Sequence, residues 1–412
     1  MNITFGNHII YDANRSDEKF DLLLFMGIFL AYAMNNFAVF LKFLGIPDVA
    51  FDHLAAIKIS ILAILLVRQI LRKRISIYWL LFIGCYLFVL LCSGLFNPDN
   101  AKYTSSIFTI FLNTVLPAIV TIQCSKSPNS FLSYLRITSY FSLTRILMAP
   151  FSTSVAVSGI VYRSMGMVYD TIVPWSVILY FAFKDKKIYD IMIAIIVPLL
   201  YVTLGTRGAI ICIVLIILYD MYLMTKNRNK LVFFFYLMLI VGAFTYLLYA
   251  PILNYARNIL ANKGLYTDVI DKILNYGITY GNGRDTIWKK DFEYISQHWL
   301  MGGGIGVDRA IFNNSGAYAH NFVIELLMDF GIIFGTALVI IIVRTVIKYL
   351  FNNNIQRQTR ALISIFMIPG ISMLLVSGSI YESYTVFAGI TVIMTMKEFL
   401  YEDSTYWNKS SG

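Results

Sequence analysis

Long runs of apolar residues, separated by short polar segments, dominate the sequence. The runs have the length of about 17 to 25 residues that an α-helix needs to cross the hydrocarbon core of a bilayer. They lie at residues 22–44, 52–71, 76–96, 104–123, 131–150, 167–183, 188–204, 208–224, 231–250, 322–346, 361–378 and 384–399. Because lipid offers no partner to unpaired backbone groups, such runs must be helical. The pattern therefore predicts an all-α polytopic membrane protein with about twelve transmembrane helices.

The polar connections between these runs predict the orientation. Basic residues gather in alternate connections, at Arg68, Arg72, Lys73, Arg74, Lys126, Lys184, Lys186, Lys187, Lys226, Arg228, Lys230, Arg344, Lys348, Arg357 and Arg360. The positive-inside bias makes this side cytoplasmic, so both termini are expected in the cytoplasm. We interpret residues 1–412 as a single transmembrane domain. Its external connections are short, except for residues 151–166 and a large loop at 251–321.

The large external loop contains a predicted short amphipathic helix. Asn282 has the position of an N-cap, Arg284 follows it, and Asp285 lies in the first turn. Apolar positions then recur at helical spacing, at Trp288, Phe292, Ile295 and Trp299. A helix with one such face is expected to lie on the bilayer surface, where it can hold Arg284 at headgroup depth. Gly302–Gly306 should end the helix. No strand precedes these glycines and their spacing differs from the dinucleotide fingerprint, which argues against a nucleotide site.

Composition agrees with a membrane protein. Hydrophobic residues make up 58% of the chain and charged residues 14%, whereas soluble domains have about 45–50% and about 25%. The net charge of +10 would suggest a nucleic-acid partner in a soluble protein. Here the basic connections account for it, and no nucleic acid is expected. The four cysteines are scattered through apolar runs and predict neither a disulfide framework nor a metal site.

Four residues near external helix ends are candidates for chemistry: Arg163, Arg207, Arg284 and His320. Taken singly, each has an ordinary explanation, since an Arg can reach up to lipid phosphates and a His can cap a helix. Together, three guanidiniums suit a bidentate grip on a diphosphate. Histidine can also take a proton near neutral pH.

The acids of the large loop show no metal-binding motif; they are Asp268, Asp271, Asp285, Asp291, Glu293 and Asp308. A metal ion that handles a diphosphate needs paired carboxylates or similar oxygen ligands. We therefore expect stabilisation of the diphosphate by arginine, without a metal ion.

At these residues the sequence resembles the superfamily of bacterial O-antigen ligases and polymerases. The similar segments of the external loop are Arg284-Asp-Thr-Ile-Trp288, Trp299-Leu-Met-Gly-Gly-Gly-Ile-Gly306 and Ala319-His-Asn-Phe-Val-Ile-Glu325 followed by Phe330-Gly-Ile-Ile333. Upstream, Thr206-Arg207-Gly208 is similar to the family's Ser/Thr-Arg-Gly turn. Arg163-Ser-Met-Gly166, followed by Asp170, is similar to its Arg-x-x-Gly segment, where Asn is commoner than Asp170. The similarity covers roughly residues 160–335.

The resemblance implies an inverting, metal-independent glycosyltransferase of the bacterial inner membrane, active on the external, periplasmic face. Its donor and acceptor would be oligosaccharides linked to undecaprenyl diphosphate, with no ATP, nucleotide sugar or other cofactor. By resemblance, Arg207 and Arg284 bind the diphosphate leaving group and Arg163 assists. His320 either deprotonates the acceptor hydroxyl or hydrogen-bonds the diphosphate, and Asn321 joins the substrate-binding group. A chain-length regulator protein is an implied partner.

Three functions remain open from the sequence. A polymerase of lipopolysaccharide or capsule repeat units, which transfers the growing glycan onto an incoming lipid-linked repeat, is the interpretation that we favour. A ligase shares this chemistry and transfers the glycan to lipid A core. A flippase for lipid-linked sugars would find an anionic path along Lys58, Arg136 and Arg145. It has no need, however, of a long external loop ending in His-Asn, and the sequence shows neither internal repeats nor paired broken helices.

Overall fold

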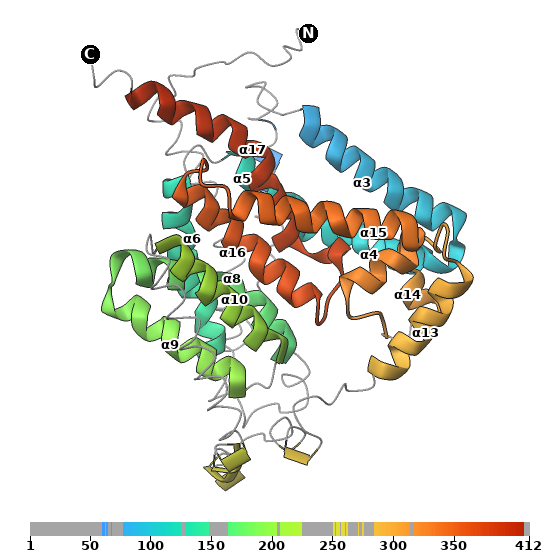
Figure 1. The fold of residues 1–412 in the computed structure, drawn as a ribbon, viewed down its shortest axis with the longest axis horizontal. Coiled ribbons are helices and arrows are strands. Elements are labelled where there is room, and N and C mark those ends of the chain that lie inside the picture. The colour runs from blue at the N-terminus through green and yellow to red at the C-terminus, as the bar shows by residue number, and fades with distance from the viewer. Residues whose placement is uncertain are drawn as a thin grey trace.

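The computed structural model is a bundle of helices (Figure 1). It describes residues 77–124, 128–147, 164–203, 207–224, 284–313 and 317–407, with isolated positions between 60 and 67 and between 250 and 275. The helices are α3 (Ile77–Phe96), η1 (Pro98–Asn100), α4 (Ala101–Ile110), η2 (Phe111–Val115), α5 (Leu116–Cys124), α6 (Pro128–Leu147), α8 (Ser164–Asp185), α9 (Ile188–Thr203), α10 (Arg207–Met224), α13 (Arg284–Gln297), α14 (Val307–Ala310), α15 (Phe322–Leu350), α16 (Arg357–Leu374), η4 (Ile380–Glu382) and α17 (Tyr384–Trp407). No strand occurs within these ranges, so the all-α prediction is confirmed there.

Most of the predicted spans coincide with helices. Nine of the twelve apolar runs overlap helices in the described part of the chain; α4, η2 and α5 together form one of them. The runs at 22–44, 52–71 and 231–250 lie outside the described residues, apart from isolated positions. Among the described helices, three are long and apolar enough to cross a membrane: Trp79–Phe96, Pro98–Gln123 and Phe322–Leu350. Shorter apolar helices are Ile188–Tyr201, Ala209–Met224 and Tyr384–Thr395. The count of twelve spans stays a prediction.

Large side chains fill the interior of the bundle. Trp175 and Tyr180 of α8, Tyr201 of α9 and Phe366 of α16 are almost fully buried. A second cluster joins α3, η2, α5 and α17 around Phe111. In contrast, many apolar side chains of α3 and α15 are exposed. An apolar outer surface is expected where lipid replaces water.

Helices that follow one another along the chain, such as α8 and α9, run antiparallel, which gives the bundle two distinct ends. The Tyr201 hydroxyl donates to Thr171 Oγ1 at 3.0 Å, which sets the end of α9 beside the beginning of α8. Cys212 near the beginning of α10 contacts Ser372 near the end of α16. At the other end, the Tyr219 hydroxyl donates to the carbonyl oxygen of Leu350 at 2.6 Å.

We call the end of the bundle with the beginnings of α8, α10 and α15 and the end of α16 the site end. The described basic connections, those at Lys184, Lys186, Lys187, Lys348 and Arg357, lie at the opposite end. The predicted separation of basic connections from candidate site residues is therefore present in the fold.

Helix α15 is broken at Gly331. This residue has φ 74° and ψ 173°, a region that essentially only glycine adopts. The break separates a short segment, Phe322–Phe330, from the long apolar segment that follows. It frees backbone groups of α15 from their partners within the helix, and a second part of the chain must satisfy them.

Candidate functional site

Helix α13 begins where the sequence predicted but ends earlier, so that Trp299 follows the helix and does not belong to it. It starts at Arg284, has Asp285 in its first turn and stops at Gln297, before the glycines. The predicted N-cap, Asn282, lies outside the described residues. Helices α13 and α14 lie beside the beginning of α15 (Figure 1).

The predicted apolar face of α13 is divided between two environments. Ile295 is buried against α15, and Trp288 Nε1 donates to the carbonyl oxygen of Ala319 at 2.8 Å. Phe292 and Trp299, however, are 54% and 52% exposed. The helix thus packs on α15 through Ile295 and Trp288, while Phe292 and the residue Trp299 after the helix are exposed. The predicted contact with a bilayer surface stays a prediction.

The glycines after α13 pair with the break in α15. Gly303 N donates to the carbonyl of Met328 and Gly304 N to that of Asp329, both at 2.9 Å, while Ile332 N donates to the carbonyl of Trp299 at 2.7 Å. These bonds satisfy the groups that the break frees. A Cβ on Gly302, whose φ is +68°, would lie 2.5 Å from the Met328 oxygen. The glycine run therefore has a structural purpose, the close docking of the loop on α15.

Arg309 in α14 is a buried cation that the sequence analysis missed. Its guanidinium donates to both carboxylate oxygens of Asp308 at 3.0 Å and lies 3.6 Å from Glu325. It stacks on the ring of Tyr103 at 3.6 Å and on that of Tyr318 at 4.7 Å. Arg309 thereby ties the loop to α4 and α15. An Asp-Arg pair in a loop gives no local sign of burial, so only its distant partners identify it.

Four acids of α13, α14 and the first segment of α15 are buried: Asp291, Asp308, Glu325 and Asp329. Glu325 accepts from Ser379 Oγ at 2.5 Å and from Ile380 N at 3.0 Å, and Asp329 accepts from the Tyr381 hydroxyl at 2.7 Å. Within the described part of the chain, neither carboxylate oxygen of Asp291 has a hydrogen-bond partner. Burial, reinforced by the charge of Asp308, raises the pKa of Asp291 to about 7. The sequence analysis counted Asp291 and Asp308 only as loop acids.

His320 is held in an unusual backbone conformation directly before α15. Its φ is 54°, in the left-handed region that non-glycine residues rarely adopt. Its Nδ1 lies 3.4 Å from Ser377 Oγ, and its ring centroid lies 3.7 Å from that of Tyr318. Burial, together with the charges of Arg284 and Arg309, lowers the pKa of His320 to about 4. The imidazole is therefore neutral at pH 7.

Asn321 has a local structural role in addition to the predicted one. Its Oδ1 accepts from Val323 N at 2.9 Å and from Ile324 N at 3.4 Å, which makes it the N-cap of α15. Its Nδ2 donates to the carbonyl oxygen of Leu375 at 3.2 Å. The side chain thus fixes the beginning of α15 to the connection after α16. Its predicted contact with substrate stays a prediction.

Arg284 differs from the other arginines singled out in the sequence. Arg136 pairs with Asp185 and Asp190, and Arg145 pairs with Asp170 at 2.5 Å. Arg284 is half-buried and makes no ion pair or hydrogen bond to any residue that the structure describes. Its positive charge nevertheless acts on His320. Arg284 is thus a cation available to an anionic ligand, whereas Arg136 and Arg145 are neutralised.

These ion pairs also bear on the transporter alternative. Two of the three cations that suggested an anionic path are satisfied by aspartates, and Lys58 lies outside the described residues. Among the described helices, α15 has a break with non-helical backbone angles, and no second such break pairs with it as in the paired broken helices of transporters.

Helix beginnings carry the predicted site residues. Arg207 and Arg284 are the first residues of α10 and α13, and His320 lies two residues before α15. Arg163 lies outside the described residues, directly before α8, and the side chain of Arg207 lies outside them as well. The N-terminus of a helix presents free N–H groups and a partial positive charge, which favours anions. The beginnings of α8, α10 and α15 lie at the site end. The beginning of α13 lies there as well, because the charge of Arg284 affects His320.

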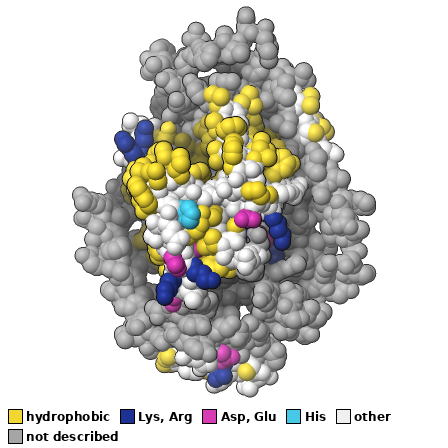
Figure 2. Space-filling view, turned by 90° about the vertical axis from the view of Figure 1, so that its right-hand side faces the viewer, with side chains coloured by type: hydrophobic (Ala, Val, Ile, Leu, Met, Phe, Trp, Pro, Cys, Tyr) yellow, Lys and Arg dark blue, Asp and Glu magenta, His cyan; other side chains and the backbone are white. Residues whose placement is uncertain are grey.

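Seen from the side on which α13 and α14 lie, the surface combines charge and apolar groups. Figure 2 shows Lys or Arg, Asp or Glu and a histidine close together, with hydrophobic side chains around them. Among the described residues, no group of three or more His, Cys, Asp or Glu side chains is arranged to hold a metal ion. The dependence of the reaction on metal is left to experiment.

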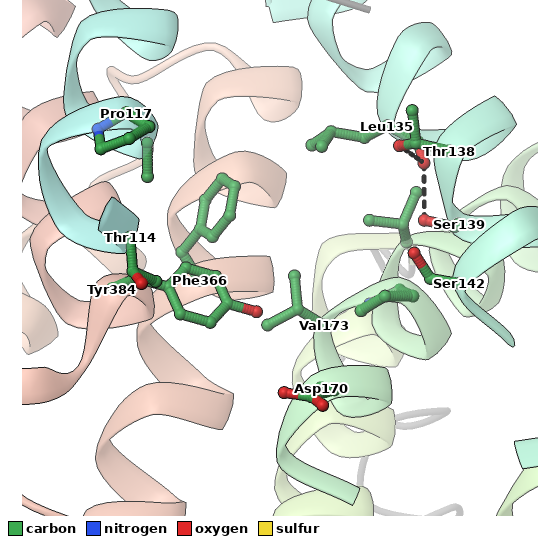
Figure 3. A pocket seen from close by; sticks show the side chains of 13 residues that line it. Thr114, Pro117, Leu135, Thr138, Ser139, Ser142, Asp170, Val173, Phe366 and Tyr384 are labelled. Carbon is green, nitrogen blue, oxygen red and sulfur yellow. Dashed lines mark hydrogen bonds between the residues drawn. The ribbon is translucent and has the colours of Figure 1, made fainter. Parts of the chain in front are cut away.

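A cavity lies between α5, α6, α8, α16 and α17 (Figure 3). It has about 630 Å³ of space, part of it open, and its lining is Thr114, Pro117, Ala118, Leu135, Thr138, Ser139, Ser142, Asp170, Val173, Pro174, Val177, Phe366 and Tyr384. Thr138 and Ser139 donate their hydroxyl hydrogens to the carbonyl oxygen of Leu135. Asp170, the residue noted in the Arg-x-x-Gly segment, borders this cavity and is paired with Arg145.

Comparison with known proteins gives one family. Residues 191–340 match the model of the family described as O-antigen ligase. The matched region runs from α9 into α15 and contains Arg207, Arg284 and His320. Among curated proteins, none matches the sequence.

Proposed function

Because the chain belongs to the superfamily of O-antigen ligases and polymerases, we propose that it polymerises lipid-linked polysaccharide repeat units. The family and the apolar helices indicate a membrane glycosyltransferase of this type. In the proposed reaction, the glycan leaves undecaprenyl diphosphate and joins a sugar hydroxyl of an incoming lipid-linked repeat unit.

One observation carries this proposal: Arg284 is a half-buried guanidinium that has no ion-pair partner among the described residues and acts electrostatically on His320. A cation without a carboxylate partner is costly to bury unless a ligand supplies the counter-charge. The planar fork of Arg matches two oxygens of a phosphate group. A diphosphate held by Arg284, with the assistance proposed for Arg207 and Arg163, would provide that counter-charge.

The proposed chemistry is a single displacement. The acceptor hydroxyl oxygen attacks the anomeric carbon from the side opposite the diphosphate, and the bond from that carbon to the diphosphate oxygen breaks with its electron pair. The configuration at the carbon is thereby inverted. The arginines stabilise the charge that develops on the leaving diphosphate, a type of contact that typically lowers a barrier by about 3–4 kcal/mol per donor. His320 would contact either the attacking hydroxyl or the diphosphate.

Donor and acceptor choice tests the proposal. Purified protein in nanodiscs should lengthen a glycan when it is given undecaprenyl-diphosphate-linked repeat units alone. If lipid A core is needed as acceptor and repeat units are not joined to each other, the protein is a ligase. Movement of lipid across a liposome bilayer without a change in glycan length would instead identify a flippase.

Metal removal gives a separate test. We expect glycan transfer to continue in the presence of EDTA, because arginine side chains neutralise the diphosphate in the proposed site. The measurement is the initial rate with and without chelator, followed by addition of Mg²⁺ or Mn²⁺. Loss of turnover on chelation and its recovery with metal would contradict the arginine-based account.

A further inference from the structure

Three hydrogen bonds in series connect the backbone to the imidazole of His320. Gly378 N donates to the Tyr318 hydroxyl oxygen at 3.1 Å. That hydroxyl lies 3.0 Å from Ser377 Oγ, and Ser377 Oγ lies 3.4 Å from His320 Nδ1. The series thus begins at a backbone N–H, which can only donate, and ends at a ring nitrogen whose role depends on where the proton is.

The number of hydroxyl hydrogens in the series determines which group donates and which accepts in each hydrogen bond. Each hydroxyl has one hydrogen to donate, and a buried hydroxyl hydrogen normally has an acceptor. Among the described residues, Ser377 Oγ is the acceptor within hydrogen-bond distance of the Tyr318 hydroxyl. Ser377 is 4% exposed, so its own hydrogen also needs a partner inside the protein. With the Tyr318 hydrogen directed at Ser377, the Ser377 hydrogen is directed at His320 Nδ1.

The reverse direction leaves a hydrogen unsatisfied. If Nδ1 carried the proton and donated to Ser377, Ser377 would have to donate to Tyr318. The Tyr318 oxygen would then accept from both Ser377 and Gly378, and its own hydrogen would have no acceptor in the described part of the chain. This arrangement is unfavourable, because the half-buried Tyr318 hydroxyl would make one hydrogen bond fewer.

We propose that Ser377 and Tyr318 hold His320 as the neutral tautomer with its proton on Nε2, so that His320 donates a hydrogen bond to the diphosphate instead of accepting the proton of the attacking hydroxyl. Ser377 and Tyr318 are then positioning residues. The inference rests on the proposed function, because that function supplies the diphosphate. The low pKa of His320 agrees with a neutral ring.

The proton of the acceptor hydroxyl then has another destination. As the new carbon–oxygen bond forms, the bond between the anomeric carbon and the diphosphate oxygen breaks, and its electron pair stays on that oxygen. The hydroxyl proton passes to the released diphosphate, which is the base that the reaction itself generates. His320 keeps its Nε2 proton throughout and stabilises the leaving group together with Arg284.

Nitrogen NMR tests the tautomer without any assay of activity. The full-length protein is labelled with ¹⁵N-histidine and measured in nanodiscs near neutral pH. The His320 signals are those that disappear in His320→Gln. We expect a proton on Nε2 and none on Nδ1. A proton on Nδ1, or on both nitrogens, would overturn the proposal.

Two substitutions of His320 test the donor role. A glutamine amide places an N–H group near the position of Nε2, whereas the shorter asparagine amide comes closer to Nδ1. Turnover of His320→Gln should therefore stay within about tenfold of wild type, while His320→Asn loses about 100- to 1,000-fold, the effect of removing one such donor. Equal and severe losses in both variants would indicate that His320 accepts the proton.

The positioning residues give the matching control. Ser377→Ala should allow both tautomers in the NMR spectrum and reduce turnover, and Ser377→Thr, which keeps the hydroxyl, should restore the wild-type spectrum. The pH profile of turnover should have the same shape in wild type and His320→Gln, because no titration of His320 is required. An ascending limb present in wild type and absent from His320→Gln would overturn the proposal.

These outcomes are distinguishable from failure of the proposed function. If the wild-type protein transfers no glycan from a lipid-linked donor, the proposed function fails and the diphosphate is lost as the partner of His320. An active wild-type protein with its proton on Nδ1 would overturn the present inference alone.

Discussion

At the scale of single residues, arginines with a carboxylate partner support the fold, whereas an arginine without one is available to a ligand. Arg309 and Arg136 have carboxylate partners, so removing either leaves a buried acid without its counter-charge. Arg284 has no such partner within the described residues, and its substitution should leave the fold intact. An effect of Arg284 on activity can therefore be attributed to the ligand.

We predict that Arg284→Lys retains the charge but loses most of the activity. A lysine ammonium is a point charge and cannot meet two phosphate oxygens in a planar fork. Single-turnover glycan transfer should fall roughly 100- to 1,000-fold, and at least as far in Arg284→Ala. Lys289→Ala is the control, since Lys289 is an exposed cation on the same helix. Near-normal turnover of Arg284→Lys would show that a positive charge alone suffices.

Asp291 should make the docking of α13 sensitive to pH. Its pKa is about 7 in the folded protein and about 3.9 in an unfolded chain. The folded state therefore binds more protons in this window, and its stability falls as the pH rises from about 4 to about 7. The protection factors of the α13 amides against hydrogen exchange, in which the intrinsic effect of pH on the exchange rate is divided out, should be lower at pH 8 than at pH 5. Asp291→Asn should abolish the difference, whereas Glu293→Gln, an exposed control on α13, should retain it. Protection factors that are equal at the two pH values in wild type would contradict the prediction.

At the scale of elements, the break in α15 and the glycine run form one unit. Each glycine permits a backbone approach that a side chain would block, and the hydrogen bonds across the contact replace those lost within α15. Interrupted helices at membrane depth are tolerated where neighbouring protein satisfies the backbone in this way.

Gly331→Ala should disrupt this unit. Its φ of +74° is strained for any other residue, and a Cβ would lie 2.5 Å from the carbonyl oxygen of Leu300. The strain alone costs on the order of 1–3 kcal/mol, so thermal unfolding should occur at a lower temperature. Gly84→Ala is the control, because Gly84 is inside α3 and a Cβ there meets nothing within 4 Å. Equal thermal stability of Gly331→Ala and wild type would mean that the break is not required.

At the scale of the whole molecule, the fold separates the site from the basic connections. The sequence predicts that residues 251–321 are external and that both termini are cytoplasmic. On this prediction we expect the site end to face the periplasm, where lipid-linked donors would be available without nucleotide sugars.

Thiol labelling tests this orientation. In a background without Cys85, Cys92, Cys124 and Cys212, Met301→Cys should react with a membrane-impermeant reagent in intact cells. Met301 is 76% exposed at the site end. Asn354→Cys, in the exposed connection between α15 and α16, should react only after the cells are opened. The opposite pattern would reverse the orientation.

The sequence by itself determined the helices and the candidates for the site. Apolar runs of spanning length predict helices because lipid leaves the backbone no other partner. The beginning of α13 at Arg284 and its end before the glycines follow from local signals within a few residues. The arginines and His320 were identifiable because charged groups are rare in apolar sequence, and the family match covers three of the four.

Only the tertiary structure decided which polar groups have partners. The pairing of Arg309 with Glu325, the closeness of the buried Asp291 to Asp308 and the contact of Ser377 with His320 join residues 16 to 57 positions apart. Local patterns contain no information on such contacts, because they depend on which helices pack together and at what depth. For the same reason, the sequence alone does not explain Gly331. Its break in α15 allows the loop at Gly302–Gly304 to pair with the backbone of α15. Burial and pairing, which decide whether a charge supports the fold or remains free for a ligand, are properties of the packed molecule.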